Sequence, residues 1–261
     1  MHLKRGKSPA GLLTLARDLK RRKARERSML FVAEGIRAVE ELLRSPVQIT
    51  GALTTESVLE HPRGGALIAA LRARGVECAT VGEADYMSAA GTEHPQGVMA
   101  IAEAPERSLA SLERADFTRV LVLDAIQDPG NVGTLIRTAA ALGVRTVVAL
   151  PGTADIWNAK VVRGAAGGHF YLTVMHADLP ELLKALRAAD VPLWGADAGG
   201  RPVADVRAPK SLALAVGNEG AGLSAAVRAA TSEIVSLPMT PGVESLNVGV
   251  AAGVLLYALN Q

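Results

Sequence analysis

Three stretches of this 261-residue chain combine polar side chains with glycine, and two of them with proline, directly after an apolar run. They are DAIQDPGNVGTLIRTAAALG (residues 124–143), AVGNEGAGLS (residues 215–224) and SLPMTPGVESLNVGVAAGV (residues 236–254). Their amides, carboxylates, guanidinium and hydroxyls can orient a ligand, grip a phosphate or move a proton. Each stretch alone is weak evidence of function, so the case depends on whether the fold brings the three together.

The first stretch predicts a helix that starts at Asn131, which follows a Pro-Gly turn and has the side chain of an N-cap. The free backbone amides at such a helix start can hold an anion. Arg137, further along the same helix, can add a charged fork for a phosphate. From this stretch alone, an ordinary arginine on the helix surface is the preferred explanation of Arg137.

The second and third stretches offer small residues beside single polar groups. Glu219 lies among glycines, which let a ligand approach the backbone closely, although a tight turn explains the glycines equally well. The spacing is not the GxGxxG fingerprint, which argues against a nicotinamide oxidoreductase. In the third stretch, Ser245 has the side chain of an N-cap, and Asn247 follows it at the start of an apolar helix. Polar groups in that position suit a site where a few hydrogen bonds orient a ligand.

The elements that position these stretches begin near residue 119. Six strongly apolar strands are predicted there, VLVLD, TVVAL, LTVMHA, VPLWGAD, SLALAVG and IVSLP, with helices beginning near Asn131, Asp178, Leu223 and Ser245. Continuous apolar runs predict strands covered on both faces, and their alternation with helices predicts a mostly parallel sheet. The ligand site of such a sheet lies beyond the carboxyl ends of its strands, where all three polar stretches fall.

The amino-terminal part of the chain predicts a separate, smaller α/β unit. We expect it to span residues 1–104, followed by a linker at 105–116 and a catalytic domain at 117–261. Its opening segment, residues 4–27, concentrates the positive charge of a chain whose net charge is only +2, and residues 9–27 are expected to form one basic helix. The basic residues are Lys4, Arg5, Lys7, Arg17, Lys20, Arg21, Arg22, Lys23, Arg25 and Arg27. Such a cluster can neutralise phosphates of a nucleic acid, and a solvated helix face is the equal alternative.

Composition excludes several other classes of protein. Cys78 is the only cysteine, so no intrachain disulfide or CxxC metal site can form, and the histidines lack the spacing of metal ligands. We therefore expect no metal. No stretch has the roughly 18 uninterrupted apolar residues of a membrane span, and the amino terminus lacks the apolar core of a signal peptide. These features predict a cytoplasmic protein that does not enter a membrane.

Taken together, NVGTLIR, GNEGAGLS and LPMTPGVESLNVGVAA resemble the three ordered motifs of the SpoU, or TrmH-like, family of RNA 2′-O-ribose methyltransferases in the SPOUT superfamily. The resemblance covers residues 119–261 in order. The preceding RRKARERSMLFVAEGIRAVEELL and EHPQGVMAIAE look like the substrate-binding domain of many members, which is similar to a ribosomal protein of the L30e type. The fold implied is a mostly parallel SPOUT sheet with a trefoil knot, after a small α/β domain.

The resemblance implies a role for fifteen residues of this chain. S-adenosylmethionine, the expected cofactor, would be held by Gly217, Leu237, Leu246, Asn218 and Met239. Catalysis and positioning of the RNA would fall to Asn131, Arg137, Glu219, Ser245 and Asn247. RNA contacts are expected at Arg21, Arg22, Lys23, Arg25 and Arg163, the last with a surface ion pair as the alternative. Gly249 departs from the family pattern, because many relatives have serine there.

The implied activity is transfer of a methyl group from S-adenosylmethionine to a ribose 2′-hydroxyl of structured RNA, with 23S rRNA as the expected substrate. A tRNA 2′-O-methyltransferase and a non-catalytic RNA-binding ribosome assembly factor are the alternatives. Binding of S-adenosylmethionine discriminates the last of these, because a pure binding module needs no cofactor pocket. The resemblance also implies a homodimer, and the apolar, glycine-rich final helix is the feature of the sequence that supports it.

Overall fold

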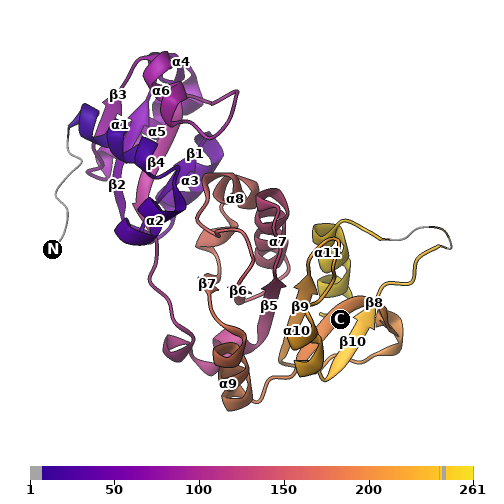
Figure 1. Cartoon of the computed structure of the whole chain (residues 1–261). Coiled ribbons are helices and arrows are strands. Elements are labelled where there is room, and N and C mark those ends of the chain that lie inside the picture. The colour runs from indigo at the N-terminus through magenta and orange to yellow at the C-terminus, as the bar shows by residue number, and fades with distance from the viewer. Residues whose placement is uncertain (1–7, 241, 243–244, 261) are drawn as a thin grey trace. The chain divides into compact units, whose positions relative to one another are not determined.

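The structure is a computed structural model that describes residues 8–240, 242 and 245–260. Lys4, Arg5 and Lys7 of the basic cluster, and Pro241 of the third stretch, lie outside the described residues. The chain divides into two compact units, which Figure 1 shows in the colours of the chain order. Unit 1 comprises Met1–Glu106 and Trp157–Phe170, and unit 2 comprises Arg107–Ile156 and Tyr171–Gln261.

Unit 1 is built on a mixed sheet that has four strands within the described residues, in the order β1-β4-β2-β3. Strand β4 runs antiparallel to both β1 and β2, whereas β2 and β3 are parallel. The elements are α1 (Pro9–Asp18), α2 (Arg22–Ser28), β1 (Leu30–Glu34), α3 (Ile36–Arg44), β2 (Ile49–Thr54), α4 (Glu56–Glu60), α5 (Pro62–Ala73), β3 (Cys78–Thr80), α6 (Glu83–Ala89), β4 (Val98–Glu103), α8 (Ala159–Ala165) and the 3₁₀ helix η3 (Gly168–Phe170).

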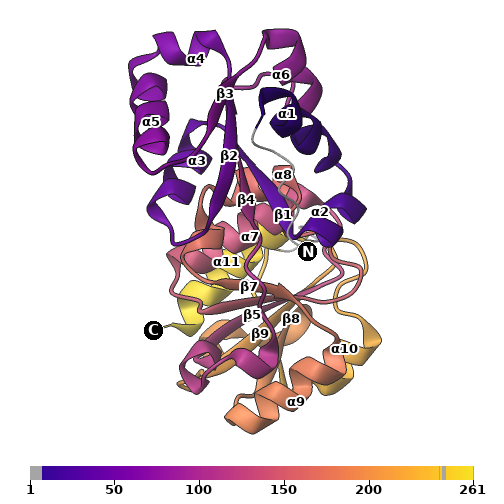
Figure 2. The ribbon, with the colours of Figure 1, turned by 90° about the vertical axis from the view of Figure 1, so that its left-hand side faces the viewer.

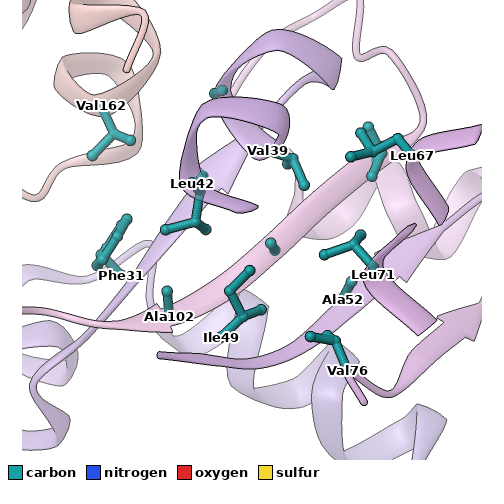
Figure 3. Packing of buried hydrophobic residues seen from close by; sticks show 14 of the residues in the cluster. Phe31, Val39, Leu42, Ile49, Ala52, Leu67, Leu71, Val76, Ala102 and Val162 are labelled. Atoms are coloured by element: carbon teal, nitrogen blue, oxygen red, sulfur yellow. The ribbon is translucent and has the colours of Figure 1, made fainter. Parts of the chain in front are cut away.

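Both faces of this sheet are covered, because successive side chains of a strand point to opposite faces. Phe31 and Ala102 face a core that α3, α4 and α5 complete, while Val32 and Met99 face a second core under α1 and α6 (Figure 2). Helix α8 also joins the first core: Val162 lies in the same cluster as Phe31 (Figure 3). A helix from the later part of the chain therefore completes the core of the amino-terminal unit.

Unit 2 is built on a sheet whose strand order is β10-β8-β9-β5-β6-β7 in the part of the chain that the structure describes, with every pairing parallel. The elements are η1 (Leu109–Ser111), η2 (Arg114–Phe117), β5 (Arg119–Asp124), α7 (Pro129–Ala141), β6 (Thr146–Ala149), β7 (Thr173–His176), α9 (Leu179–Ala189), β8 (Leu193–Pro202), η4 (Val203–Asp205), β9 (Leu212–Gly217), α10 (Ala225–Ala230), β10 (Glu233–Ser236) and α11 (Val248–Leu259). The predicted parallel sheet is thereby confirmed.

Helices α9 and α10 cover one face of this sheet, and α7 and α11 lie on the other (Figure 2). The last helix packs closely on α7 because two of its glycines receive threonine side chains. A Cβ built on Gly249 would lie 2.8 Å from Cγ2 of Thr134, and one on Gly253 would lie 3.2 Å from Cγ2 of Thr138. The Gly249-xxx-Gly253 spacing thus serves packing between helices, and Thr134 fills the space that a serine side chain at Gly249 would need.

The structure corrects three local predictions. The basic segment over residues 9–27 is two helices, because Leu19–Arg21 breaks the helical run between α1 and α2. Helix α7 is capped by Asp128, not by Asn131: proline is favoured at the first position of a helix, so the residue before Pro129 becomes the cap. Helix α11 is capped by Asn247, not by Ser245, which lies two residues before Asn247.

Candidate active site

The three polar stretches follow strands that end at the same edge of the parallel sheet of unit 2. Strand β5 ends at Asp124, β9 at Gly217 and β10 at Ser236. Carboxyl ends of parallel strands lie together, and an open sheet of this kind binds ligands beyond them. The fold therefore gathers the stretches that the sequence separates by many residues.

One residue from each stretch joins a continuous chain of side-chain hydrogen bonds. Nδ2 of Asn247 donates to Oδ1 of Asn131 at 2.9 Å, and Nδ2 of Asn131 donates to Oε1 of Glu219 at 2.6 Å. Oδ1 of Asn247 accepts from the backbone N–H groups of Gly249 at 2.9 Å and Val250 at 3.4 Å. The side chains of Asn131, Glu219 and Asn247, predicted to act together, do meet in space.

The loop after β9 is held in a tight shape by Asn218 and by the end of β5. Nδ2 of Asn218 donates to the carbonyl oxygen of Ala125 at 3.0 Å, and its Oδ1 accepts from the N–H groups of Gly220 at 3.0 Å and Ala221 at 3.1 Å. The carboxylate of Asp124, which is 4% exposed, accepts from the N–H of Ser224 at 2.6 Å. Both ends of the loop that carries Glu219 are therefore tied to the neighbouring strand.

Sequence reasoning missed the roles of Asp124 and Asp128. Asp128 accepts from the N–H of Asn131 at 2.9 Å and so fixes the helix start that presents the Asn131 side chain. Two signals were available: an acid that ends an apolar strand, and an acid directly before proline at a helix start. Neither signal distinguishes a positioning role from an ordinary loop residue.

The residues expected to hold S-adenosylmethionine fit such a ligand. A Cβ on Gly217 would lie 2.2 Å from the carbonyl carbon of Gly222, so only glycine lets the loop fold back at this point. Leu237 and Met239 follow β10 and are half-buried, while Leu246, directly before Asn247, is 44% exposed. Apolar side chains beside a tight glycine turn suit a ligand that has an apolar ring and a few polar groups.

Arg137 lies on α7 with its side chain exposed. Within the described residues its guanidinium makes no hydrogen bond or ion pair. A free guanidinium can form a bidentate contact with a phosphate, because all of its donors remain available. Ser245 is likewise exposed, close in sequence to Asn247.

The five residues predicted to contact RNA separate into two groups. Arg21, Arg22 and Lys23 are exposed on unit 1; Arg21 pairs with Asp18 at 2.5 Å and Arg22 with Glu26 at 2.7 Å. Surface pairs of this kind are weak, so phosphates can compete for both guanidinium groups.

Arg25 and Arg163 differ from that group. The Arg25 side chain is buried, and its Nη1 donates to the carbonyl oxygens of Leu19 at 2.6 Å and Lys20 at 3.0 Å. Burial leaves no accessible guanidinium for a phosphate, so the structure does not support Arg25 as an RNA contact. Nη1 of Arg163 lies 3.4 Å from Oε2 of Glu34, whose side chain is 2% exposed. Arg163 therefore forms an ion pair, but with a buried carboxylate and not on the surface as the alternative explanation had it.

In residues 8–240, 242 and 245–260, no three His, Cys, Asp or Glu side chains come close enough to share a metal ion. None of the helices within the same ranges has the length and apolar character needed to cross a lipid bilayer.

The fold and the site define an α/β protein whose candidate ligand site is built from loops at the carboxyl edge of a parallel sheet. Comparison with known proteins identifies the family. Residues 118–257 match the SpoU rRNA methylase family, and residues 14–100 match the MRM3-like substrate binding domain. The chain belongs to the SpoU rRNA methylase family.

Individual relatives are similar to this chain over nearly its whole length. The 23S rRNA (guanosine(2553)-2′-O)-methyltransferase RlmP of Bacillus subtilis is 38% identical over 244 residues, covering 93% of each chain. The AdoMet-bound rRNA methyltransferase of Sinorhizobium meliloti is 26% identical with a TM-score of 0.83, covering 95% of this chain and 93% of that one. The SpoU methyltransferase AviRb of Streptomyces viridochromogenes, in complex with AdoMet, is 27% identical with a TM-score of 0.82, covering 95% and 96%.

Proposed function

We propose that this chain transfers the methyl group of S-adenosylmethionine to a ribose 2′-hydroxyl of 23S rRNA. The observation that carries the proposal is the hydrogen-bonded chain from Asn247 through Asn131 to Glu219, which unites the three motifs. Glu219 of this chain lies in the same loop as Gly217, where only glycine lets the loop fold back. The relatives that match most of this chain are named as 23S rRNA 2′-O-methyltransferases, which favours ribosomal RNA over transfer RNA.

The roles of the side chains follow from their chemistry. S-adenosylmethionine supplies an electrophilic methyl group, and the protein must bring the ribose oxygen into line with it. Arg137 is the group that grips the adjacent phosphate and stabilises negative charge developing on the ribose oxygen. Its guanidinium stays protonated in a protein, so Arg137 is not the base. The hydroxyl of Ser245 adds a further polar group close in sequence to Asn247.

The test is incubation with labelled S-adenosylmethionine and unmodified ribosomal or transfer RNA, followed by mapping of the methylated ribose. We expect label at one ribose of 23S rRNA. Label in transfer RNA alone would favour the tRNA enzyme. Binding of the methyl donor without transfer to either RNA would contradict the proposed activity, and absence of donor binding would favour the assembly factor.

Arg137→Ala is the matched variant for this assay. Because Arg137 makes no hydrogen bond within the described residues, its removal leaves the fold intact. We expect affinity for S-adenosylmethionine to stay within about twofold, while methyl transfer falls by about 100-fold, the size of effect that loss of one transition-state contact produces. Normal turnover by this variant would remove the assignment.

We further propose that unit 1 binds the RNA through Arg21, Arg22 and Lys23, which are exposed side by side. Contacts of this kind release counterions, so affinity should fall steeply as salt rises. Replacing all three by glutamine should weaken binding and flatten the dependence on salt. Arg17, which pairs with Asp85 at 2.8 Å and also donates to the Ser88 hydroxyl at 2.7 Å, provides the comparison position.

The homodimer remains a proposal that α11 supports. Four exposed apolar side chains follow one face of this helix and the residues before it: Leu246, Val250, Val254 and Tyr257, at 44%, 53%, 47% and 62% exposure. An exposed apolar stripe of this kind marks a protein interface. Light scattering should give twice the mass of one chain for the wild-type protein and the mass of a single chain for Val254→Asp. We also propose that the reaction takes place in the cytoplasm, keep the boundaries 1–104, 105–116 and 117–261 as a proposal, and expect the carboxy-terminal segment to thread a trefoil knot.

A further inference from the structure

The direction of every hydrogen bond in the Asn247–Asn131–Glu219 chain is fixed by the start of α11. The backbone N–H groups of Gly249 and Val250 can only donate, so the Asn247 atom that faces them must be its oxygen. Its amide nitrogen then faces Asn131 and donates to Oδ1. Asn131 must in turn present its own nitrogen to Glu219.

The chain ends on an atom that can only accept. Oε1 of Glu219 receives the Asn131 N–H at 2.6 Å, a short bond that is typical of a charged acceptor. A proton on Oε1 would be directed at the N–H group, so Oε1 stays unprotonated while the chain is intact. Oε2 accepts no hydrogen bond within the described residues and remains the open position of this carboxylate.

We propose that the amides at the start of α11 act through Asn247 and Asn131 to hold Glu219 as a carboxylate, whose Oε2 takes the proton of the ribose hydroxyl. This inference rests on the proposed function, which names no group that takes the proton, and it assigns that role to Glu219. Asn247 and Asn131 are positioning residues in this scheme. Glu219 is the catalytic group.

The step balances with the groups named. The ribose oxygen bonds to the methyl carbon, the carbon–sulfur bond breaks with its electron pair on sulfur, and the hydroxyl proton moves to Oε2. A carboxylate suffices because the oxygen becomes strongly acidic as the new carbon–oxygen bond forms. No external oxidant or reductant takes part.

Few other charges face the carboxylate from the elements that meet here. Helix α7 carries Arg137 as its one titratable residue, with Asp128 at its cap, and α11 carries Tyr257 alone. The loop from Gly217 to Leu223 has no titratable side chain besides Glu219, but Asp197, which pairs with Arg228, lies against it at Gly222, and Asp124 binds the N–H of Ser224 just after it. These charges are the same in every variant below, so a difference between two variants reports on the hydrogen-bonded chain.

Glu219→Gln separates proton transfer from architecture. Glutamine keeps an oxygen that accepts from Asn131 but cannot take a proton. We expect kcat to fall by about 100-fold, as loss of a general base does, with the dissociation constant for S-adenosylmethionine within about twofold of wild type. Wild-type kcat in this variant overturns the proposal.

Asn247→Asp tests the polarity of the chain. Aspartate still caps α11 but has no N–H for Asn131, which then turns its amide and presents an oxygen to Oε1. Two oxygens at that distance need a proton between them, so the acid limb of the kcat profile should move up by about one pH unit. Ala221→Asp, which adds a charge to the same exposed loop outside the chain, should move it less.

The same shift should be visible without turnover. In labelled protein free of donor and RNA, the side-chain amide signal of Asn131 should follow the titration of Glu219, at higher pH in Asn247→Asp. Equal shifts in Asn247→Asp and Ala221→Asp overturn the proposal. If Asn247→Asp fails to fold, Asn131→Asp makes the same oxygen–oxygen contact and replaces it, with the side-chain amide of Asn247 as the reporter. A wild-type protein that methylates no RNA refutes the proposed function separately, because the amide titration still reports on the chain.

Discussion

In each unit of the molecule, one strand ends at a residue whose carboxylate is buried. Glu34 is the last residue of β1 in unit 1, and Asp124 is the last residue of β5 in unit 2. Both are almost fully buried, and both accept a backbone N–H from a distant loop: Gly91 at 2.9 Å for Glu34, and Ser224 at 2.6 Å for Asp124. The same local device occurs in both units.

Their surroundings differ. Glu34 has Arg163 of α8 beside it, and its Oε1 has no hydrogen-bond partner within the described residues, as is true of the hydroxyl of nearby Tyr86. Burial raises the pKa of that phenol, and the charge of Glu34 adds to the effect. Asp124 forms no ion pair in the described part of the chain. Glu34 holds a helix to the sheet of unit 1, whereas Asp124 shapes the loop that carries the candidate site.

The largest effect should come from Asp124→Ala. Its removal takes the charged acceptor from the partly buried Ser224 N–H, which should lower the free energy of unfolding by about 2 kcal/mol. The loop after β9 also loses an anchor, so the dissociation constant for S-adenosylmethionine should rise by about tenfold, equal to about 1.4 kcal/mol. Urea denaturation and calorimetry measure the two quantities.

Asp124→Asn is the control, because the amide oxygen can still accept from Ser224. It should recover most of the stability and affinity. If Asp124→Ala lost stability but bound the cofactor like wild type, Asp124 would be an ordinary structural residue, and the contrast with Glu34 would disappear.

Glu34→Ala should have a smaller effect, confined to unit 1. It removes the acceptor of the Gly91 N–H, but Arg163 is 35% exposed and water can solvate its guanidinium. We expect a loss of about 1 kcal/mol in the free energy of unfolding and unchanged affinity for S-adenosylmethionine. Weaker cofactor binding in Glu34→Ala would show that the two carboxylates do not serve separate units.

The sequence predicted the framework of this comparison but not its details. Continuous apolar runs predicted the parallel sheet, and the convergence of Asn131, Glu219 and Asn247 followed from the loops at its edge. The membership of Trp157–Phe170 in unit 1 could not be predicted, because an amphipathic helix has the same pattern whichever sheet it packs on. The burial of Arg25 was missed for a similar reason: a run of basic residues does not show which guanidinium turns inward to cap carbonyl groups.

Gly249→Ser tests how α11 is held against the helix that presents Asn131. The added Cβ would lie 2.8 Å from Cγ2 of Thr134, so stability should fall by about 1 kcal/mol. Thr134→Ser removes that methyl group and should restore most of the loss in the double variant. Additive losses in a double-mutant cycle would contradict direct contact between the two positions.

The smallest effects concern two alanines with left-handed backbone, one in each unit. Ala125 follows Asp124 with φ 56°, and Ala166 ends α8 with φ 48°. Glycine adopts this conformation without strain, but it also makes the unfolded chain more flexible, so each substitution by glycine should change stability by less than about 1 kcal/mol. The two should differ in function. The carbonyl of Ala125 accepts from Asn218, so a looser Ala125→Gly backbone should weaken binding of S-adenosylmethionine by about twofold to threefold, whereas Ala166→Gly should leave it unchanged. Equal cofactor affinities in the two variants would mean that the strained backbone at the end of β5 does not help to shape the site.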